Sequence, residues 1–296
     1  MSNLLRSYTR IQSLLHELES KDNFLNQVRL PKLTDKQLIA LNLAAEALGI
    51  DSERYLFKQP PDQLKPMIGR SVYNRRRRSL ASKIEEFRQV IAHQIVTFSE
   101  HHIIDSIPVE VCKFARANRS KICRDTVEQS PNHGYCAAQK THYFGYKLHA
   151  VCTASGVFKA FDITQASVHD IQYLNDVKTQ FSNCVLIGGR GYLSRQYQQD
   201  LFDHNQIELA TPARKNQLNS KPFSRSFSKA RKRIETLFSQ LCDQFIPQGH
   251  LVIRRNYAKS FKGFATRMIS KLTALTVIQW INKRNGNINN LKIVIS

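Results

Sequence analysis

The stretch that decides the fold reads Asn183-Cys184-Val185-Leu186-Ile187-Gly188-Gly189-Arg190-Gly191-Tyr192-Leu193. Its first part, residues 184–187, is a short apolar run of the kind that forms a buried parallel strand. Glycines then favour a turn, and a helical pattern follows over residues 193–203. A strand that leads through a glycine turn into a helix is typical of α/β proteins, so we predict that fold class.

Further strand and helix patterns lie on both sides of this stretch. Alternating or apolar runs predict strands at residues 103–105, 109–112, 144–152, 157–163 and 206–210. Helical patterns are expected at residues 226–245 and 264–283. This order is compatible with a mixed sheet flanked by helices, which we place in one domain over residues 99–296.

Residues 1–98 carry a helical pattern instead. Leucine and isoleucine recur at three- and four-residue steps near the N-terminus, and Thr34 opens a second helix with capping chemistry. Pro60-Pro61 interrupts the pattern, and a third helix is expected over residues 71–95. It carries Arg75-Arg76-Arg77-Arg78, so we predict a helix-turn-helix-like DNA-binding region. A plain three-helix bundle with a solvated arginine face would show the same pattern.

The charge of the chain indicates a polyanionic partner. Lys and Arg number 44 against 23 Asp and Glu, a formal net charge of +21. Residues 205–296 hold 17 of the basic residues and 3 of the acidic ones, whereas residues 99–204 hold 11 and 10. Solubility needs a net charge of only about 2–8, so the surplus favours nucleic acid as the partner.

Cysteine usage and hydropathy narrow the class of protein further. The six cysteines form no Cys-x-x-Cys pair, so we expect reduced, mostly buried thiols and neither disulfide staples nor a zinc site. The N-terminus lacks the apolar core of a signal peptide, and no apolar run reaches the roughly 18 residues of a membrane span. We therefore expect a cytoplasmic protein with no membrane partner.

Two further segments each contain an isolated acidic residue. Asp105 lies in Ile-Ile-Asp-Ser-Ile-Pro, and Glu235 lies in Arg-Lys-Arg-Ile-Glu-Thr-Leu. With the stretch around Gly189, these segments resemble the DDE motif of bacterial insertion-sequence transposases. The middle segment of that family usually reads Gly-Asp-x-Gly-Tyr, and Gly189 stands here where the aspartate belongs. The resemblance implies an RNase H-like mixed sheet flanked by helices.

The resemblance also implies a reaction and its partners. Transposases hydrolyse phosphodiesters and transfer strands, and two Mg²⁺ (or Mn²⁺) ions held by carboxylates can activate the attacking oxygen and stabilise the leaving one. Asp105 and Glu235 are the expected catalytic and metal-binding residues, and the metal site is expected to be weakened by Gly189. The expected partners are double-stranded DNA, as insertion-sequence ends and target, and a second copy of the chain in a homodimer on DNA. Such a protein would associate with the bacterial nucleoid.

Each candidate residue has an ordinary structural explanation as well. Asp105 could be a turn former, and Glu235 could belong to a helix salt bridge of a few tenths of a kcal/mol. Arg231 and Arg233 are expected to contact phosphate or to orient Glu235, but they could be solvated. Arg190, next to the substituted position, is also expected to bind DNA.

A second group of residues supports the resemblance more loosely. His169 and Asp170 match a His-Asp element of the family, and Asp170 could equally cap a helix. It is also the nearest chemical substitute for the missing carboxylate. Tyr146, Lys147 and His149 could face DNA or simply alternate along a strand.

Position 189 admits three explanations, namely an inactivating substitution, a degenerate copy of the element, or a misaligned motif served by another acid. We favour loss of the carboxylate, because Gly188, Gly191 and Tyr192 keep their motif positions. The predicted function is that of a transposase impaired in this copy. The alternatives are a non-enzymatic repressor that binds the element's DNA and a host nuclease on the same fold.

Overall fold

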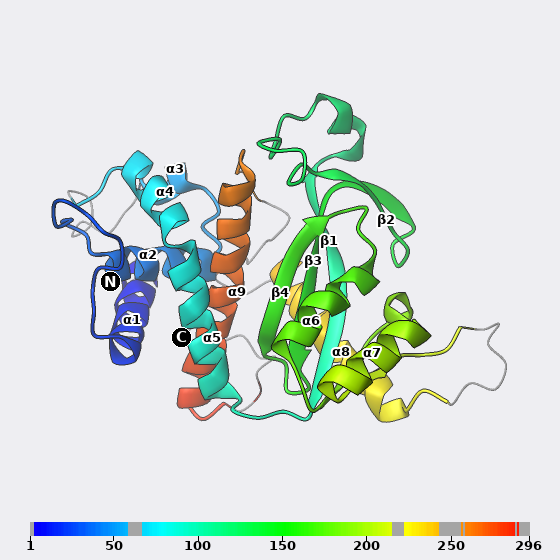
Figure 1. Cartoon of the computed structure of the whole chain (residues 1–296). Coiled ribbons are helices and arrows are strands. Elements are labelled where there is room, and N and C mark those ends of the chain that lie inside the picture. Colours follow the sequence, from blue (N-terminus) through cyan, green and yellow to red (C-terminus); the bar gives the residue numbers. More distant parts are fainter. Residues whose placement is uncertain are drawn as a thin grey trace. The chain divides into compact units, whose positions relative to one another are not determined.

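The computed structural model describes residues 3–58, 67–214, 222–242, 256, 258–287 and 289. The chain divides into two compact units, one built of helices and the other of a sheet with helices (Figure 1). An α/β unit comprises Ile95–Ser239, and a helical unit comprises Met1–Gln94 and Gln240–Ile288, with short C-terminal pieces assigned to each. Each unit is described by itself.

The α/β unit is built on a mixed six-stranded sheet. Its order is β2-β3-β1-β5-β6, and β4 pairs with β3. The strands are β1 (His101–Cys112), β2 (Asn132–Cys136), β3 (Thr141–Thr153), β4 (Phe158–Gln165), β5 (Cys184–Ile187) and β6 (Ile207–Ala210). β3 is antiparallel to β1, β2 and β4, whereas β5 is parallel to β1 and to β6. The parallel strand expected at residues 184–187 is confirmed.

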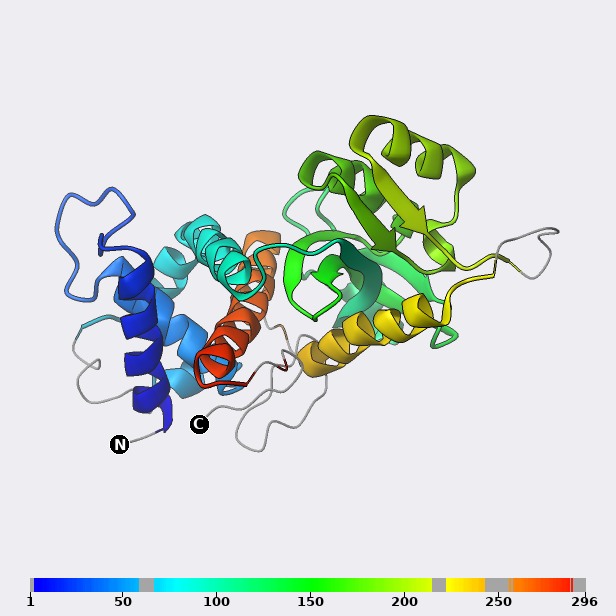
Figure 2. The ribbon, with the colours of Figure 1, turned by 90° about the horizontal axis from the view of Figure 1, so that it is seen from below.

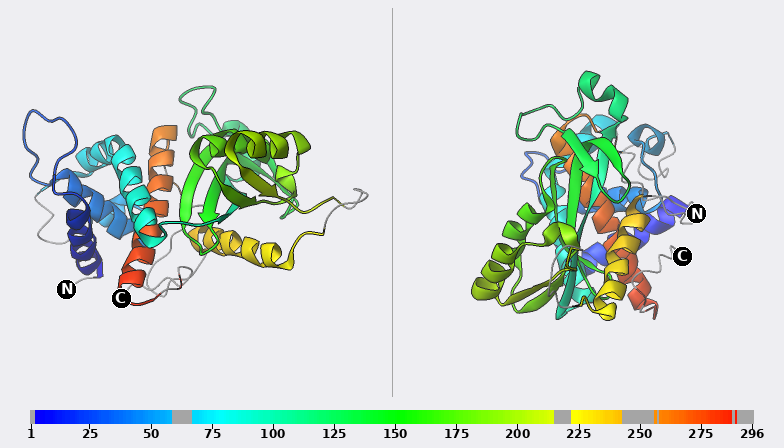
Figure 3. Two further views of the ribbon diagram at one scale, coloured as in Figure 1. Left: turned by 60° about the horizontal axis from the view of Figure 1, so that its bottom comes forward. Right: turned by 90° about the vertical axis from the view of Figure 1, so that its right-hand side faces the viewer.

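Helices cover both faces of this sheet, as Figures 2 and 3 show. α6 (Leu174–Gln180) and α7 (Arg195–Asn205) lie on one face, and α8 (Arg225–Cys242) lies along the other. The core beneath α6 and α7 gathers apolar side chains from helices and strands, among them Ile104, Leu174, Leu186, Leu201 and Ile207. The expected fold class, an RNase H-like mixed sheet flanked by helices, is confirmed.

Some elements of the α/β unit differ from the sequence expectation. β1 runs unbroken through Pro108, which pairs with Lys147. The strand β2 and the short 3-10 helix η1 (Phe114–Arg119) were not expected. A short 3-10 helix, η2 (Asp170–Tyr173), lies between β4 and α6. Another, η3 (Arg190–Tyr192), follows β5. Residues beyond Cys242 in the helix expected at 226–245 lie outside the described residues.

The helical unit holds α1 (Asn3–Leu18), α2 (Asp35–Ala47), α3 (Glu53–Leu56), α4 (Arg70–Ser79), α5 (Ala81–Ile95) and α9 (Phe261–Arg284). Thr34 caps α2 in a capping box with Gln37, as its sequence predicts. The single helix expected over residues 71–95 is two helices: α4 ends at Ser79 with Leu80 as its C-cap, and α5 begins at Ala81. Pro60-Pro61 lies outside the described residues.

α9 belongs to the helical unit, whereas the sequence pattern places residues 261–284 in the domain over residues 99–296. Its buried polar side chains pair with the N-terminal helices, since Ser270 accepts a 2.8 Å hydrogen bond from Asn42 and Lys271 lies 2.9 Å from Glu46. These partners lie more than 200 positions apart, so no local pattern shows them. Within the described residues, no helix is long and apolar enough to cross a membrane.

Candidate active site

Asp105 lies in the middle of β1 with its carboxylate partly shielded from solvent. Its Oδ1 accepts a 2.9 Å hydrogen bond from the Ser106 N–H, and its Oδ2 accepts a 3.2 Å hydrogen bond from Nη2 of Arg231 on α8. Both side chains of this ion pair are 24% exposed. Burial raises the pKa of the Asp105 carboxyl, and the Ser106 N–H and Arg231 only partly oppose that effect. The carboxylate therefore lacks full compensation for its charge.

Gly189 lies beside Asp105 because of the strand register. β1 and β5 run parallel with Ile103 opposite Ile187. Two residues further along each chain, Asp105 and Gly189 therefore lie next to each other. Gly189 is buried and caps η3 with extended backbone angles, φ −81° and ψ 178°. Any residue adopts such angles, so the backbone does not require glycine here.

The space next to Gly189 is occupied by a cation. A Cβ added at position 189 would lie 3.2 Å from Nη2 of Arg231, which is the atom that also binds Asp105. Apart from its neighbours in the chain, the only other described atom within 4 Å of that Cβ is the Arg231 Cζ at 3.6 Å. One guanidinium thus faces both Asp105 and the position where the motif calls for a second carboxylate.

Glu235 lies on α8, one helical turn beyond Arg231. Its side chain is exposed, and no hydrogen bond or ion pair joins it to another described residue. The face of α8 formed by Ile234, Leu237 and Phe238 is buried, so these residues fix the rotation of the helix. Residues four apart share a face, which puts Glu235 on the side of α8 that Arg231 presents to Asp105. Convergence of Asp105 and Glu235 on a shared metal stays a prediction.

Asp170 is held by neighbours of its own. Its Oδ1 accepts a 3.0 Å hydrogen bond from Ser106 Oγ and lies 2.9 Å from Lys147 Nζ. Gly191 allows this approach, because a Cβ there would lie 3.0 Å from Asp170 Oδ2. His169 is exposed and accepts the Ile171 N–H at Nδ1. Asp170 therefore ties η2 to β1 through Ser106, the residue that follows Asp105.

Two of the β3 residues that could have faced DNA point into the protein. The Tyr146 hydroxyl donates a 2.6 Å hydrogen bond to the Gln129 carbonyl. His149 stacks on Tyr173 at 5.1 Å, and burial lowers the pKa of its imidazole to about 4. Lys147 is half-buried and also bonds to the Val168 carbonyl. For these residues the structural explanation is favoured over DNA contact.

The residues present do not assemble the donor set that two metal ions need. Position 189 has no side chain, Arg231 engages Asp105, and Lys147 engages Asp170. In the described part of the chain, no group of three or more His, Cys, Asp or Glu residues could hold a metal ion. A pair of divalent cations therefore does not fit this site as it is arranged here.

The basic residues expected to bind DNA have different surroundings. Arg76 is buried and pairs with Asp35, and Arg77 is buried and pairs with Glu53 at 2.6 Å, so both hold α4 in place. Arg75 is exposed, and Arg78 is half-buried. The expected four-arginine DNA face thus reduces to two residues, because the buried Asp35 and the half-buried Glu53 pair with the other two. On the α/β unit, Arg190 is exposed and Arg233 is half-buried.

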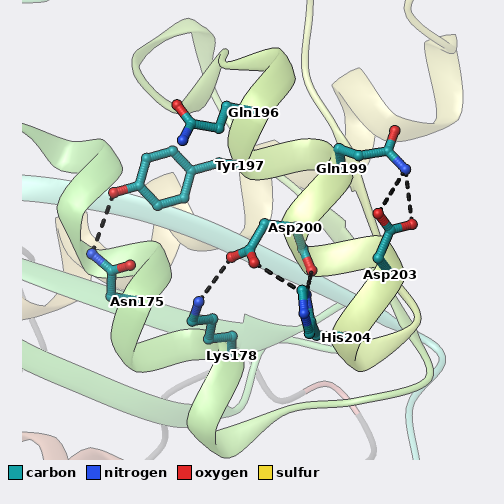
Figure 4. A pocket seen from close by; sticks show the side chains of 8 residues that line it. All are labelled: Asn175, Lys178, Gln196, Tyr197, Gln199, Asp200, Asp203 and His204. Atoms are coloured by element: carbon teal, nitrogen blue, oxygen red, sulfur yellow. Dashed lines mark hydrogen bonds and ion pairs between the residues drawn. The ribbon is translucent and has the colours of Figure 1, made fainter.

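An open polar pocket of about 660 Å³ lies between α6 and α7 (Figure 4). Asp200 is at its centre, 2.8 Å from Lys178 and 3.1 Å from His204, and the Lys178 hydrogen bond lowers the pKa of the Asp200 carboxyl. Asn175 donates to the Tyr197 hydroxyl at 3.3 Å. None of the candidate site residues named from the sequence lines this pocket. The Lys178–Asp200 and Asn175–Tyr197 contacts join α6 to α7.

Comparison with known proteins bears on the family of the chain. A family model described as "Transposase DDE domain" matches residues 97–247, about half of the chain. The match spans Asp105, Gly189 and Glu235 together. Neither the curated proteins nor the solved structures yielded a significant match.

Proposed function

This chain belongs to the family of transposase DDE domains, and we propose that it binds the ends of an insertion sequence while its strand cleavage is impaired by Gly189. DDE transposases generally use divalent metal ions. In our proposal Asp105 and Glu235 are the two acids of this site that the chain retains. The third acid is absent.

The observation that carries the proposal is the shared contact of Arg231. The same Nη2 lies 3.2 Å from Asp105 Oδ2 and 3.2 Å from the Cβ position of residue 189. Strand register thus brings position 189 next to the first acid, where a carboxylate would add a second set of oxygen ligands. With glycine there, a guanidinium faces a lone carboxylate, and a guanidinium pairs with carboxylate or phosphate oxygens and does not bind a metal ion.

DNA is the proposed partner on electrostatic grounds. The formal net charge of +21 is far above what solubility needs, and exposed arginines such as Arg75 and Arg190 have no acidic partner among the described residues. We propose that the affinity for duplex DNA falls steeply with salt, because neutralising phosphates releases counterions. A flat dependence of affinity on sodium chloride concentration would remove DNA as the main partner.

The decisive experiment is a cleavage assay on DNA carrying the element's ends, in millimolar Mg²⁺ or Mn²⁺. The proteins are the chain as it stands, Gly189→Asp, and Gly189→Asn as a matched control of the same size without charge. We expect cleavage with Gly189→Asp at least roughly 100-fold faster than with the other two, because metal-assisted stabilisation is worth several kcal/mol. Asp105→Asn or Glu235→Gln added to Gly189→Asp should abolish it.

Robust cleavage by the Gly189 chain would contradict impairment, and Asp170→Asn would then test whether Asp170 substitutes. The missing carboxylate also favours a second function, that of a repressor which binds the ends without cutting them. Specific binding of the ends, with no cleavage even by Gly189→Asp, would favour the repressor over the transposase. Homodimer formation on DNA stays a prediction, which the stoichiometry of the same complexes would test.

A further inference from the structure

Five rings line one face of the hairpin formed by β2 and β3, together with the short helix η1. The cross-strand pairs Tyr135–His142 and His133–Phe144 place four rings on the same face. Phe114 of η1 lies across both histidines. We call this set the ring surface, and it lies at the edge of the sheet where β2 is the last strand (Figure 1).

The rings form one continuous ladder. Centroid distances are 4.9 Å for Tyr135–His142, 6.0 Å for His142–Phe114, 5.5 Å for Phe114–His133 and 5.1 Å for His133–Phe144. Phe144 at one end is buried, whereas Phe114 and Tyr135 are 47% and 53% exposed. The ladder is thus anchored in the core and offers aromatic area to solvent.

The opposite face of the hairpin holds this surface in its orientation. A Cβ at Gly134 would meet the Ala166 carbonyl at 2.7 Å and the Tyr143 ring at 2.9 Å, so the hairpin backbone packs closely on that side. Tyr143 is buried there. The rings on the outer face are therefore preorganised, which lowers the entropic cost of binding a flat ligand.

Basic residues flank the ring residues along the chain, and their side chains are exposed to solvent. The exposed basic residues of this segment are Lys113, Arg116, Arg119, Lys121, Arg124 and Lys140. No ion pair within the described part of the chain engages any of the six. Only Asp125 and Glu128 oppose them in the same segment, residues 113–140. Arg124 donates to the Ala117 carbonyl, which ties the loop to η1.

Exposed rings with unpaired cations are the combination that proteins use for single-stranded nucleic acid. Bases stack on the rings, and the cations follow the phosphates. A duplex keeps its bases stacked on one another, so aromatic side chains gain this contact only with unpaired bases. A membrane or an acidic protein would use the cations, but it would make no specific use of ring faces.

We propose that the ring surface binds unpaired nucleotides of DNA, with bases stacked on Phe114 and Tyr135. The proposal rests on the proposed function in one respect, that DNA is the ligand, and it requires no carboxylate at position 189. It adds to that function a binding site for a strand that has separated from its partner at a DNA end.

The test is equilibrium binding of the full chain to a fluorescent oligothymidine and to a duplex of the same length at one salt concentration. Phe114→Leu and Tyr135→Thr remove one ring each, while Phe114→Tyr and Tyr135→Phe keep a ring and serve as matched controls. We expect each ring removal to weaken oligothymidine binding roughly 5- to 100-fold. Duplex binding should change less than about twofold, and the ring-keeping variants should bind as the unaltered chain does.

Lys140→Gln is the control for charge, because it should weaken binding of both DNAs. The proposal is overturned if the unaltered chain does not bind oligothymidine, if removing the rings has no effect, or if it weakens single-stranded and duplex binding equally. Thermal unfolding of each variant shows whether the fold is retained. Cleavage by Gly189→Asp is measured separately. Restored cleavage together with no oligothymidine binding by the unaltered chain would overturn this inference and leave the proposed function standing.

Discussion

Arg231 forms an ion pair with Asp105 at 3.2 Å, and the same guanidinium nitrogen lies 3.2 Å from where a side chain at position 189 would begin. This pairing defines the electrostatics of the site. A single cation shields one carboxylate and is placed to shield a second. It also explains how the chain can lack the motif's acid without leaving Asp105 unpaired.

The first prediction concerns coupling between position 189 and Arg231. Gly189→Asp should change the free energy of unfolding in chelator only slightly, because the new carboxylate gains Arg231 as a partner. Arg231→Ala together with Gly189→Asp should be less stable than the two single changes imply, by about 1 kcal/mol or more, since two adjacent carboxylates then repel each other. Urea unfolding of the four proteins gives the coupling energy. Simple additivity would show that Arg231 does not mediate between the two positions.

The second prediction compares two glycines. Gly189→Ala should alter stability by less than about 1 kcal/mol, because among the described residues beyond its chain neighbours its Cβ meets only the end of the flexible Arg231 side chain. Gly145→Ala should cost about 2 kcal/mol or more, since its Cβ would clash with the Val109 carbonyl in the neighbouring strand. Thermal or urea unfolding measures both. Equal costs would contradict the packing described around position 189.

The third prediction separates two neighbouring arginines on α4. Arg76→Ala should destabilise the fold by about 3 kcal/mol, because the fully buried Asp35 carboxylate loses its cation. Arg75→Ala should leave stability within about 0.5 kcal/mol, since the side chain is exposed. If Arg75 contacts a phosphate, its loss should reduce the salt slope of DNA binding by about 1. Equal stability of the two variants would refute the assignment of Arg76 to the interior.

The fourth prediction concerns pH. Burial, with a smaller contribution from Lys159, lowers the pKa of His102 to about 4 from an ordinary value of 6.5. A lowered histidine pKa means that the unfolded chain binds more protons between these values, so stability falls as the pH drops from about 6.5 to 4. The loss due to His102 should approach about 3 kcal/mol at pH 4. His102→Leu should remove that part of the slope in urea unfolding across this window, and an unchanged slope would exclude His102 as its source.

Local sequence patterns were enough to predict several secondary-structure elements, the family and the class of partner. The apolar run of residues 184–187, the alternation of β3 and the capping chemistry at Thr34 all reflect interactions within a few residues, so they predicted β5, β3 and α2. The motif segments around Asp105, Gly189 and Glu235 predicted the family that the comparison found. The net charge of +21, which needs no structure at all, indicated the class of partner.

Other features depend on contacts between residues far apart in the sequence, and only the tertiary structure shows them. The four arginines of α4 are equivalent in sequence, but ion pairs with the buried Asp35 and the half-buried Glu53 select Arg76 and Arg77 for the interior. The same holds for α9, whose polar residues found partners more than 200 positions away. The ring surface needed the register of β2 on β3, because five rings scattered over residues 114–144 meet only when the hairpin closes. Burial and ion pairing are long-range in sequence, and a local pattern cannot show which of several similar side chains will satisfy them.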